Sequence, residues 1–287
     1  MMDLALSILS STLIFVVFKL FDVYKIQTLY AIIVNYVVAC IVGLFVYEGP
    51  VKMGDAVESS WFLGPIFLGV LFITIFNLMA KTAQVAGVSV ASVATKMSLV
   101  IPVLFGVLFY QEHLSAWQII GILLALVAVY LASLKEQHIT IHKKDLILPT
   151  LVFLGSGVID TSIKYFEEQH LTSQEIPLFS SMVFGCAALT GFIFIGFKAF
   201  KNPLRINLKN VLGGIALGVP NYFSIFFLIR ALRSDMLESA ALFTLNNVAI
   251  VMFSTLVGIL MFKERLSMKN WSGVVLAVLS IILVALF

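Results

Sequence analysis

A single lysine lies in the middle of the long apolar segment VSVASVATKMSLVIPVLFGVLF, residues 88–109. An ammonium group enclosed by lipid costs about 2.5 kcal/mol or more on membrane-insertion scales, so Lys96 is a candidate functional residue. Its chemistry suits a carboxylate or phosphate on a bound solute, and the alternative is pairing with a carboxylate of the same chain. Pro102 follows one to two helical turns later. It predicts a helix irregularity next to Lys96, which would then face a hydrated cavity, and we assign Pro102 a role in coupling or gating.

Two further lysines and one carboxylate lie inside apolar segments. Lys19 and Lys164 occupy corresponding positions of two similar segments, LSSTLIFVVFKLF and LGSGVIDTSIKYF. Each is close enough to a helix end to extend its ammonium to the membrane surface, but the correspondence keeps both as candidates for solute binding. Asp160 precedes Lys164 by four residues, which places the two on one helix face and favours an internal ion pair. The alternative role of Asp160 is proton coupling.

Uncharged polar side chains complete the set of candidate binding residues. Amides within apolar segments hydrogen-bond either a polar solute or a neighbouring helix. The amides are Asn35, Asn77, Asn221, Asn246 and Asn247, and the phenols are Tyr36 and Tyr222. We favour Asn246 and Asn247 for solute binding, because they lie at about the depth in their helix that Lys96 has in its own.

The segments that carry these residues are long and apolar on every side. Hydrophobic residues make up 61% of the 287 residues and charged residues only 11%, against about 25% in an average soluble domain. Because about 20 apolar residues in a helix cross the hydrocarbon of a bilayer, the sequence predicts an all-α integral membrane protein with ten transmembrane helices. The predicted spans are residues 4–21, 28–47, 61–80, 88–110, 116–134, 146–165, 175–198, 209–230, 237–262 and 269–287.

The sequence also contains an internal repeat. GVLFYQEHLSAWQIIGILLALVAVYL, residues 106–131, matches GILMFKERLSMKNWSGVVLAVLSIIL, residues 258–283. The polar identities include Glu112 with Glu264 and Ser115 with Ser267, and the serine is suited to cap the helix that follows it. We therefore expect a first five-helix repeat at residues 1–134, a connecting loop at 135–145 and a second repeat at 146–287. An odd number of helices per repeat inverts the second repeat in the membrane.

The paired turns EHLS and ERLS, each followed by a glycine at Gly121 or Gly273, resemble those of the EamA-type transporters in the drug/metabolite transporter superfamily. The resemblance covers essentially the whole chain. It implies a ten-helix carrier of metabolites, amino acids or drugs that works by alternating access. We interpret Glu112 and Glu264 as turn and gating residues. Pro102 fits a proline common in the fourth helix of the family, whereas Ser254 occupies the corresponding position of the second repeat.

These observations predict a secondary transporter of a small polar solute, such as an anionic metabolite or an amino acid. Its partners would be the solute and the lipid bilayer, with no nucleic acid, as a monomer or homodimer. We expect it in the plasma (inner) membrane of a bacterium, with no enzymatic activity, no cofactor and no metal. The alternatives are an intramembrane enzyme, which would need convergent carboxylates or clustered histidines, and a membrane scaffold without transport activity.

Overall fold

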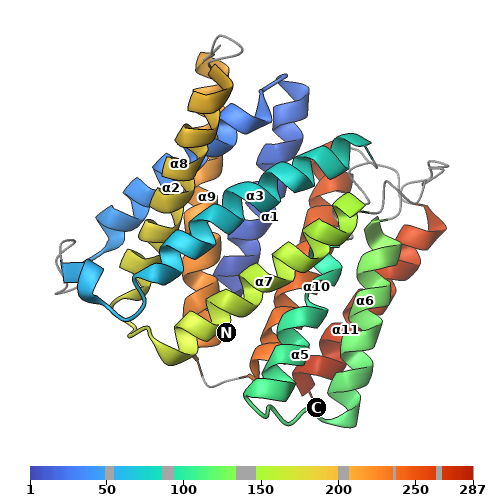
Figure 1. Ribbon diagram of the computed structural model, residues 1–287. Helices are drawn as coiled ribbons and strands as arrows, with labels where there is room; N and C mark the ends of the chain where they lie inside the picture. Colours follow the sequence, from blue (N-terminus) through green and yellow to red (C-terminus); the bar gives the residue numbers. More distant parts are fainter. Residues whose placement is uncertain are drawn as a thin grey trace. The chain divides into compact units, whose positions relative to one another are not determined.

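The computed structural model of the chain is all-α in the residues it describes, which are 1–48, 55–85, 94–133, 147–199, 207–234, 237–262 and 267–286. Figure 1 shows their arrangement along the chain. The α-helices are α1 (Met2–Val23), α2 (Thr28–Val46), α3 (Leu63–Val85), α5 (Val100–Phe109), α6 (Ala116–Ser133), α7 (Ile147–Gln169), α8 (Ile176–Ala199), α9 (Leu208–Leu232), α10 (Ser239–Phe262) and α11 (Met268–Leu286), and Asp55–Glu58 forms a 3-10 helix.

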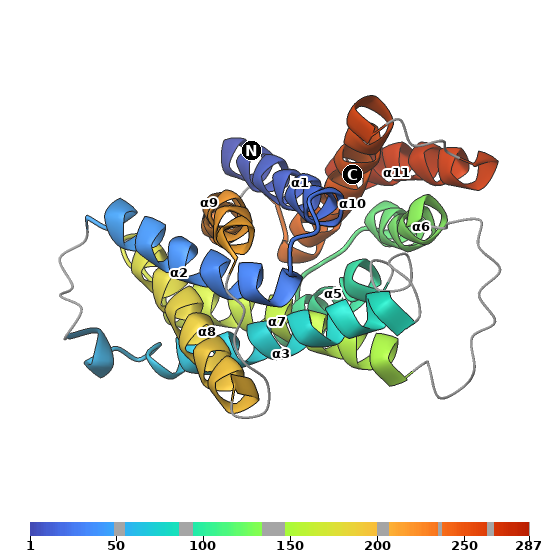
Figure 2. The same cartoon turned by 90° about the horizontal axis from the view of Figure 1, so that it is seen from above.

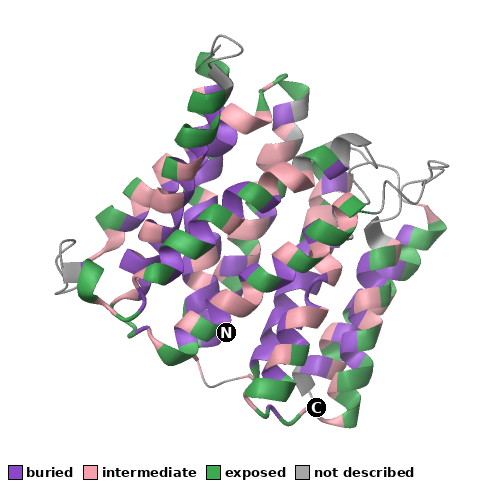
Figure 3. Ribbon diagram, viewed as in Figure 1, coloured by how far each residue is buried: buried purple, intermediate pink, exposed green. Residues whose placement is uncertain are grey.

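These helices confirm the ten-helix prediction, and most of their bounds are close to the predicted spans. The exception is the fourth span, predicted at 88–110, because α5 begins only at Val100. Five of them have both the length and the apolar composition to cross a membrane, namely Thr28–Val46, Ile147–Gln169, Ile176–Phe197, Leu208–Leu232 and Ser239–Met261. The other described helices are apolar over shorter stretches. Large apolar residues are exposed along α6 and α8, as helices facing lipid require. Figure 3 shows where exposed residues lie on the ribbon. The chain is a multi-pass membrane protein.

The helices form two compact units, and each unit takes helices from both halves of the sequence. Unit 1 consists of Met1–Thr74 and Tyr165–Arg233, and unit 2 consists of Ile75–Lys164 and Ser234–Phe287. The boundary between the units falls within α3 and within α7, so that each of these helices contributes one part to each unit. Every other α-helix lies within one unit. The spatial units therefore differ from the two sequence repeats at 1–134 and 146–287. The connecting loop at 135–145 lies outside the described residues.

In unit 1, small residues let helices approach closely. Helix α9 packs against α1 and α2, and α2 also packs against α8, which crosses it in the view of Figure 2. A Cβ atom on Gly218 of α9 would lie 2.9 Å from the carbonyl oxygen of Asn35 on α2. A Cβ atom on Gly69 of α3 would lie 2.7 Å from the backbone nitrogen of Ala187 on α8. Glycine at these positions is what allows the backbones to come together within a membrane.

Unit 2 is built on the pairing of α6 with α11, the last helices of the two sequence repeats. Ala125, Ala128 and Val129 of α6 pack with Ala277 of α11 and with α10 in one buried cluster. Two interhelical hydrogen bonds accompany this packing. The Ser280 hydroxyl donates to the Gly121 carbonyl at 2.8 Å, and the Asn270 side-chain amide donates to the Leu131 carbonyl at 3.0 Å.

Both of these helices begin with a reciprocal capping arrangement. The Ser115 backbone N–H donates to the side-chain oxygen of Gln118 at 2.8 Å, and the Gln118 N–H donates to the Ser115 hydroxyl at 3.1 Å. Ser267 and Asn270 exchange the same two hydrogen bonds at the start of α11, at 3.0 and 3.3 Å. Each pair satisfies helix N–H groups that would otherwise lack an acceptor. The predicted capping role of the two repeat serines is confirmed.

Glu175 connects three segments of unit 1 outside the membrane-spanning helices. It accepts hydrogen bonds from the Trp61 indole at 2.9 Å, from the Thr172 backbone N–H at 2.9 Å and from the Thr172 hydroxyl at 2.6 Å. Partial burial acts to raise the pKa of Glu175. The hydrogen bonds from Thr172 and Trp61 and the charge of Arg233 outweigh that effect, and its pKa is lowered.

We expect Gly69→Ala to destabilise the protein and Gly196→Ala to leave it unchanged or slightly more stable. Alanine favours a helix over glycine by about 1 kcal/mol at both sites. The new Cβ at position 69 meets the backbone of α8, whereas none of the described atoms lies within 4 Å of a Cβ at position 196. Thermal unfolding in detergent measures both variants. A Gly69→Ala variant as stable as Gly196→Ala would show that the close α3–α8 approach is wrong.

We expect the stabilising effect of Glu175 to depend on pH. Because its pKa is lowered on folding, its ionised form stabilises the fold above the ordinary value of 4.5, and this contribution is lost as the pH falls through the folded-state pKa. Wild type should therefore exceed Glu175→Gln in unfolding temperature at neutral pH, and the difference should shrink below pH 4.5. A difference that does not change with pH would contradict this account of Glu175.

Candidate functional site

Lys96 lies beside a break in its helix. Residues 94–97 are helical, Ser98 and Leu99 form a turn, and α5 begins at Val100. Pro102 has no N–H to donate to the Ser98 carbonyl, as the α-helical pattern would require. That carbonyl instead accepts from the Ile101 N–H at 2.9 Å. The irregularity predicted from Pro102 is thus present, two residues after Lys96.

The Lys96 ammonium donates a hydrogen bond to the side-chain oxygen of Asn247 at 3.1 Å. Asn247 and the adjacent Asn246 are buried on α10, which packs against α5 within unit 2. Asp160 of α7 is close enough to Lys96 for an electrostatic interaction. An amide oxygen accepts from an ammonium without neutralising its charge, so among these two groups Asp160 is the one that can compensate it.

Two other predicted residues lie on the same unit. Lys164 is buried on α7, and its ammonium lies 5.6 Å from the centroid of the Tyr110 ring, in a cation–π contact. Its predicted ion pair with Asp160 stays a prediction. Asn77 is half-buried on α3. The side chain of Lys19 lies outside the described residues.

Glu112 makes a contact that sequence reasoning missed. Its carboxylate is buried against the first turn of α10, where Oε1 accepts from the Ser239 N–H at 3.2 Å and from the Ser239 hydroxyl, and Oε2 accepts from the Ala240 N–H at 3.1 Å. A negative charge at a helix N-terminus satisfies free N–H groups and favours the helix dipole. Gly106 makes room for it, because a Cβ there would lie 2.6 Å from Glu112 Oε2.

The contact of Glu112 fixes the helix that carries Asn247. A carboxylate that binds two backbone N–H groups and a hydroxyl has its acceptor sites occupied by the fold, which favours a structural role. The gating role predicted for Glu112 stays a prediction. Glu264, its counterpart in the second repeat, lies outside the described residues.

The remaining predicted residues form a separate group in unit 1. The Asn221 amide donates to the Asn35 side-chain oxygen at 3.0 Å, which links α9 to α2 inside the unit. The Tyr36 ring stacks on Phe184 with centroids 6.1 Å apart. The Tyr222 hydroxyl is buried and has no hydrogen-bond partner among the described residues. Unit 1 therefore holds a neutral polar group, whereas unit 2 holds the charged one.

Comparison with known proteins bears on what these groups do. A family model described as "Sugar transport protein" matches residues 69–287, and a model described as "EamA-like transporter family" matches residues 3–134. The chain belongs to the EamA-type transporters of the drug/metabolite transporter superfamily. The resemblance carried by the EHLS and ERLS turns is confirmed.

Two individual proteins are similar to this EamA-type transporter over nearly its whole length. An uncharacterized protein of Haemophilus influenzae is 30% identical over 288 aligned positions, which cover 98% of this chain and 96% of the relative. A protein of known crystal structure superposes with a TM-score of 0.72 at 14% identity, covering 98% of this chain and 95% of the other. The second likeness shows a shared fold.

We expect Glu112→Ala to lower the stability of the transporter more than Glu112→Gln. Alanine removes the acceptors for the first turn of α10, at a cost of about 1–3 kcal/mol for buried donors left without partners. Glutamine keeps one acceptor oxygen and loses the charge. Unfolding temperatures measured in detergent should decrease in the order wild type, Glu112→Gln, Glu112→Ala. If both variants matched wild type, the capping contact would have no energetic role.

Proposed function

We propose that the protein is a secondary transporter that moves a small polar solute with an acidic group across a bacterial plasma membrane by alternating access. The observation that supports this cargo best is the hydrogen bond between Lys96 and Asn247. Membership in a transporter family supports transport itself. The transporter would work as a monomer or homodimer, without a cofactor.

The chemistry of the Lys96 group favours an anionic solute. The 3.1 Å bond to Asn247 uses one of the three ammonium protons of Lys96. A carboxylate or phosphate can accept another, and a charge-assisted hydrogen bond away from bulk water is about twice as strong as a neutral one. The Asn247 amide keeps its own N–H groups for a second oxygen of the same solute. This pair thus offers donors from two helices to one acidic group.

Two residues beside this pair have proposed supporting roles. Asp160 is the carboxylate in electrostatic reach of Lys96, and it would compensate the ammonium charge when no solute is bound. Pro102 and the turn at Ser98 and Leu99 interrupt the helix next to Lys96. A broken helix lets its two parts move separately, which a gate requires.

A neutral sugar is the second candidate cargo. The family model that matches residues 69–287 is described as a sugar transport protein. Sugars are recognised by amide and hydroxyl groups beside aromatic rings. The Asn35 and Asn221 amides and the buried Tyr222 hydroxyl in unit 1 are groups of this kind. An acidic cargo predicts that transport falls when the Lys96 charge is removed, whereas a neutral sugar predicts that transport stays the same.

We expect Lys96→Met to reduce uptake of an acidic solute into proteoliposomes by about tenfold or more, because one charge-assisted hydrogen bond contributes about 1.5–3 kcal/mol. A thermal-shift screen of organic acids, phosphates, amino acids and sugars first identifies a solute that binds the folded protein. The matched control is Lys81→Met, which removes an exposed lysine of α3.

The result separates the two cargo classes. Loss of uptake in Lys96→Met alone supports the acidic cargo. Uptake of an acidic solute that is equal in wild type and in both variants removes Lys96 from the site. A panel in which only neutral sugars bind, with transport unchanged in Lys96→Met, would replace the acidic cargo with a sugar.

A further inference from the structure

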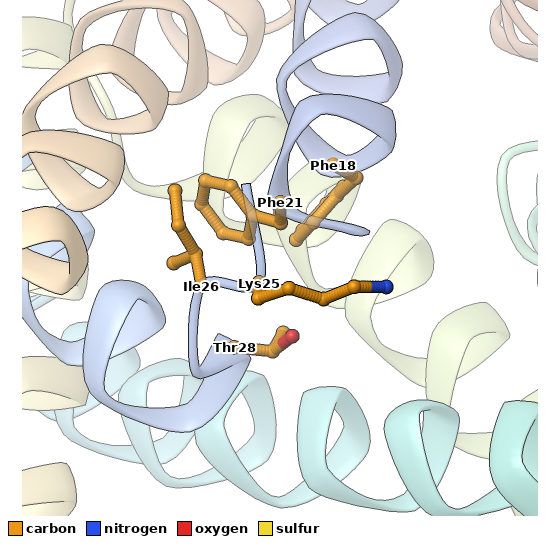
Figure 4. Close-up of a pocket in the computed structure, with 5 residues that line it drawn as sticks. All are labelled: Phe18, Phe21, Lys25, Ile26 and Thr28. Atoms are coloured by element: carbon orange, nitrogen blue, oxygen red, sulfur yellow. The ribbon is translucent and has the colours of Figure 1, made fainter. Parts of the chain in front are cut away.

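A cavity lies at the connection between α1 and α2, apart from the Lys96 group. It has a volume of about 350 Å³ and is lined by Phe18, Phe21, Lys25, Ile26 and Thr28, all of unit 1 (Figure 4). Helix α1 ends at Val23 and α2 begins at Thr28. A connection this short between two membrane-spanning helices lies at the boundary between hydrocarbon and water, the depth of lipid phosphates.

The cavity has a polar side and an apolar side. Figure 4 shows the Lys25 ammonium and the Thr28 hydroxyl on the right-hand side of the view, with Phe18 above the Lys25 side chain and with Phe21 and Ile26 to the left. Phe18 and Phe21 meet edge to face, with centroids 5.6 Å apart. An ammonium and a hydroxyl next to aromatic rings suit a ligand that joins an anionic group to an apolar portion.

The connection is held in place before any ligand binds. The Gln27 backbone N–H donates to the Asn210 side-chain oxygen at 2.9 Å, and the Asn210 amide donates to the Gln27 side-chain oxygen at 3.3 Å. Two of the lining side chains also pack closely against α9, because a Cβ on Gly213 would lie only 2.9 Å from Ile26 and 3.0 Å from Phe21. A preformed cavity loses less entropy when it binds.

Lys25 occupies a backbone conformation that favours glycine. Its φ is 55°, at the end of α1, where the Ile26 N–H donates to the Phe21 carbonyl at 2.9 Å. Helices commonly end with glycine in this conformation, and other residues cost about 1 kcal/mol more there. The chain places a lysine at this position, and its side chain lines the cavity.

We propose that this cavity binds the phosphate of an anionic phospholipid, with Lys25 and Thr28 on the phosphate and with Phe18 and Ile26 against the upper part of an acyl chain. The site is separate from the proposed cargo site, and its occupant comes from the bilayer. A lipid is favoured over free phosphate because the cavity has an apolar wall and lies at headgroup depth.

Native mass spectrometry of the detergent-purified full chain, titrated with phosphatidylglycerol, tests the proposal. We expect Lys25→Gln to weaken binding about tenfold and Thr28→Val to weaken it about threefold, as loss of one charged and one neutral hydrogen bond predicts. The matched control is Lys269→Gln, which removes an exposed lysine at the start of α11, outside the cavity. It should bind as wild type does.

Four results would overturn the proposal. Lys25→Gln could bind phosphatidylglycerol as tightly as wild type, or Lys269→Gln could lose as much affinity, which would show that general surface charge attracts the lipid. Equal affinity for phosphatidylcholine would show that the site does not select an anionic lipid. Displacement of the lipid by millimolar inorganic phosphate would show that the ligand is the free ion. Unfolding temperatures of all variants, measured alongside, identify any variant that does not fold.

Discussion

The protein must accommodate the positive charge of Lys96 within an apolar segment, beside the break that precedes α5. The cost of enclosing an ammonium is high enough that the surroundings have to supply partners for it. Among the described residues, the side-chain oxygen of Asn247 is one such partner, and Asp160 adds a negative charge within reach. The position of Asn247 depends on α10, whose first turn is held by Glu112. The placement of the Lys96 charge thus depends on the segment that carries it, on α7, on α10 and on the turn that carries Glu112.

Within each unit, glycine and serine allow the helices to pack closely, where lipid gives no hydrophobic drive for their association. Gly69 and Gly218 allow close approach in unit 1, and Gly121 and Ser280 connect α6 to α11 in unit 2. Each unit combines helices of both sequence repeats. The repeat therefore relates similar segments of the sequence, whereas the units show which helices pack together. Among the candidate site residues, Lys96, Asp160 and Lys164 lie in unit 2, and a neutral group of Asn35, Tyr36, Asn221 and Tyr222 lies in unit 1.

Local patterns explain what the sequence could predict. Membrane thickness sets the length of apolar helices, Pro102 forces a break near its own position, and Ser115 caps a helix that begins at the next residue. Most contacts between distant residues were beyond such reasoning, and the exception is Lys96 with Asn247, whose similar depth in their helices pointed to one site. The bond from Glu112 to the start of α10 and the pairing of Asn35 with Asn221 join residues more than 120 positions apart. The repeat relates equivalent helices, but it does not say which helices touch. The sequence allowed Lys96 to pair with a carboxylate of the same chain, but it did not identify Asp160 as that carboxylate, since helix spacing connected Asp160 only with Lys164.

The most direct test of the account is whether position 96 opens to both sides of the membrane. In a background with Cys40 and Cys186 replaced by alanine, Lys96→Cys can be treated with a membrane-impermeant thiol reagent added to one side or the other of proteoliposomes with known orientation. Ala125→Cys, in the buried α6–α11 cluster, is the control. Alternating access with Lys96 in the site predicts that the reagent labels position 96 from either side and leaves position 125 unlabelled. Labelling of position 96 from one side only, or from neither, would contradict it.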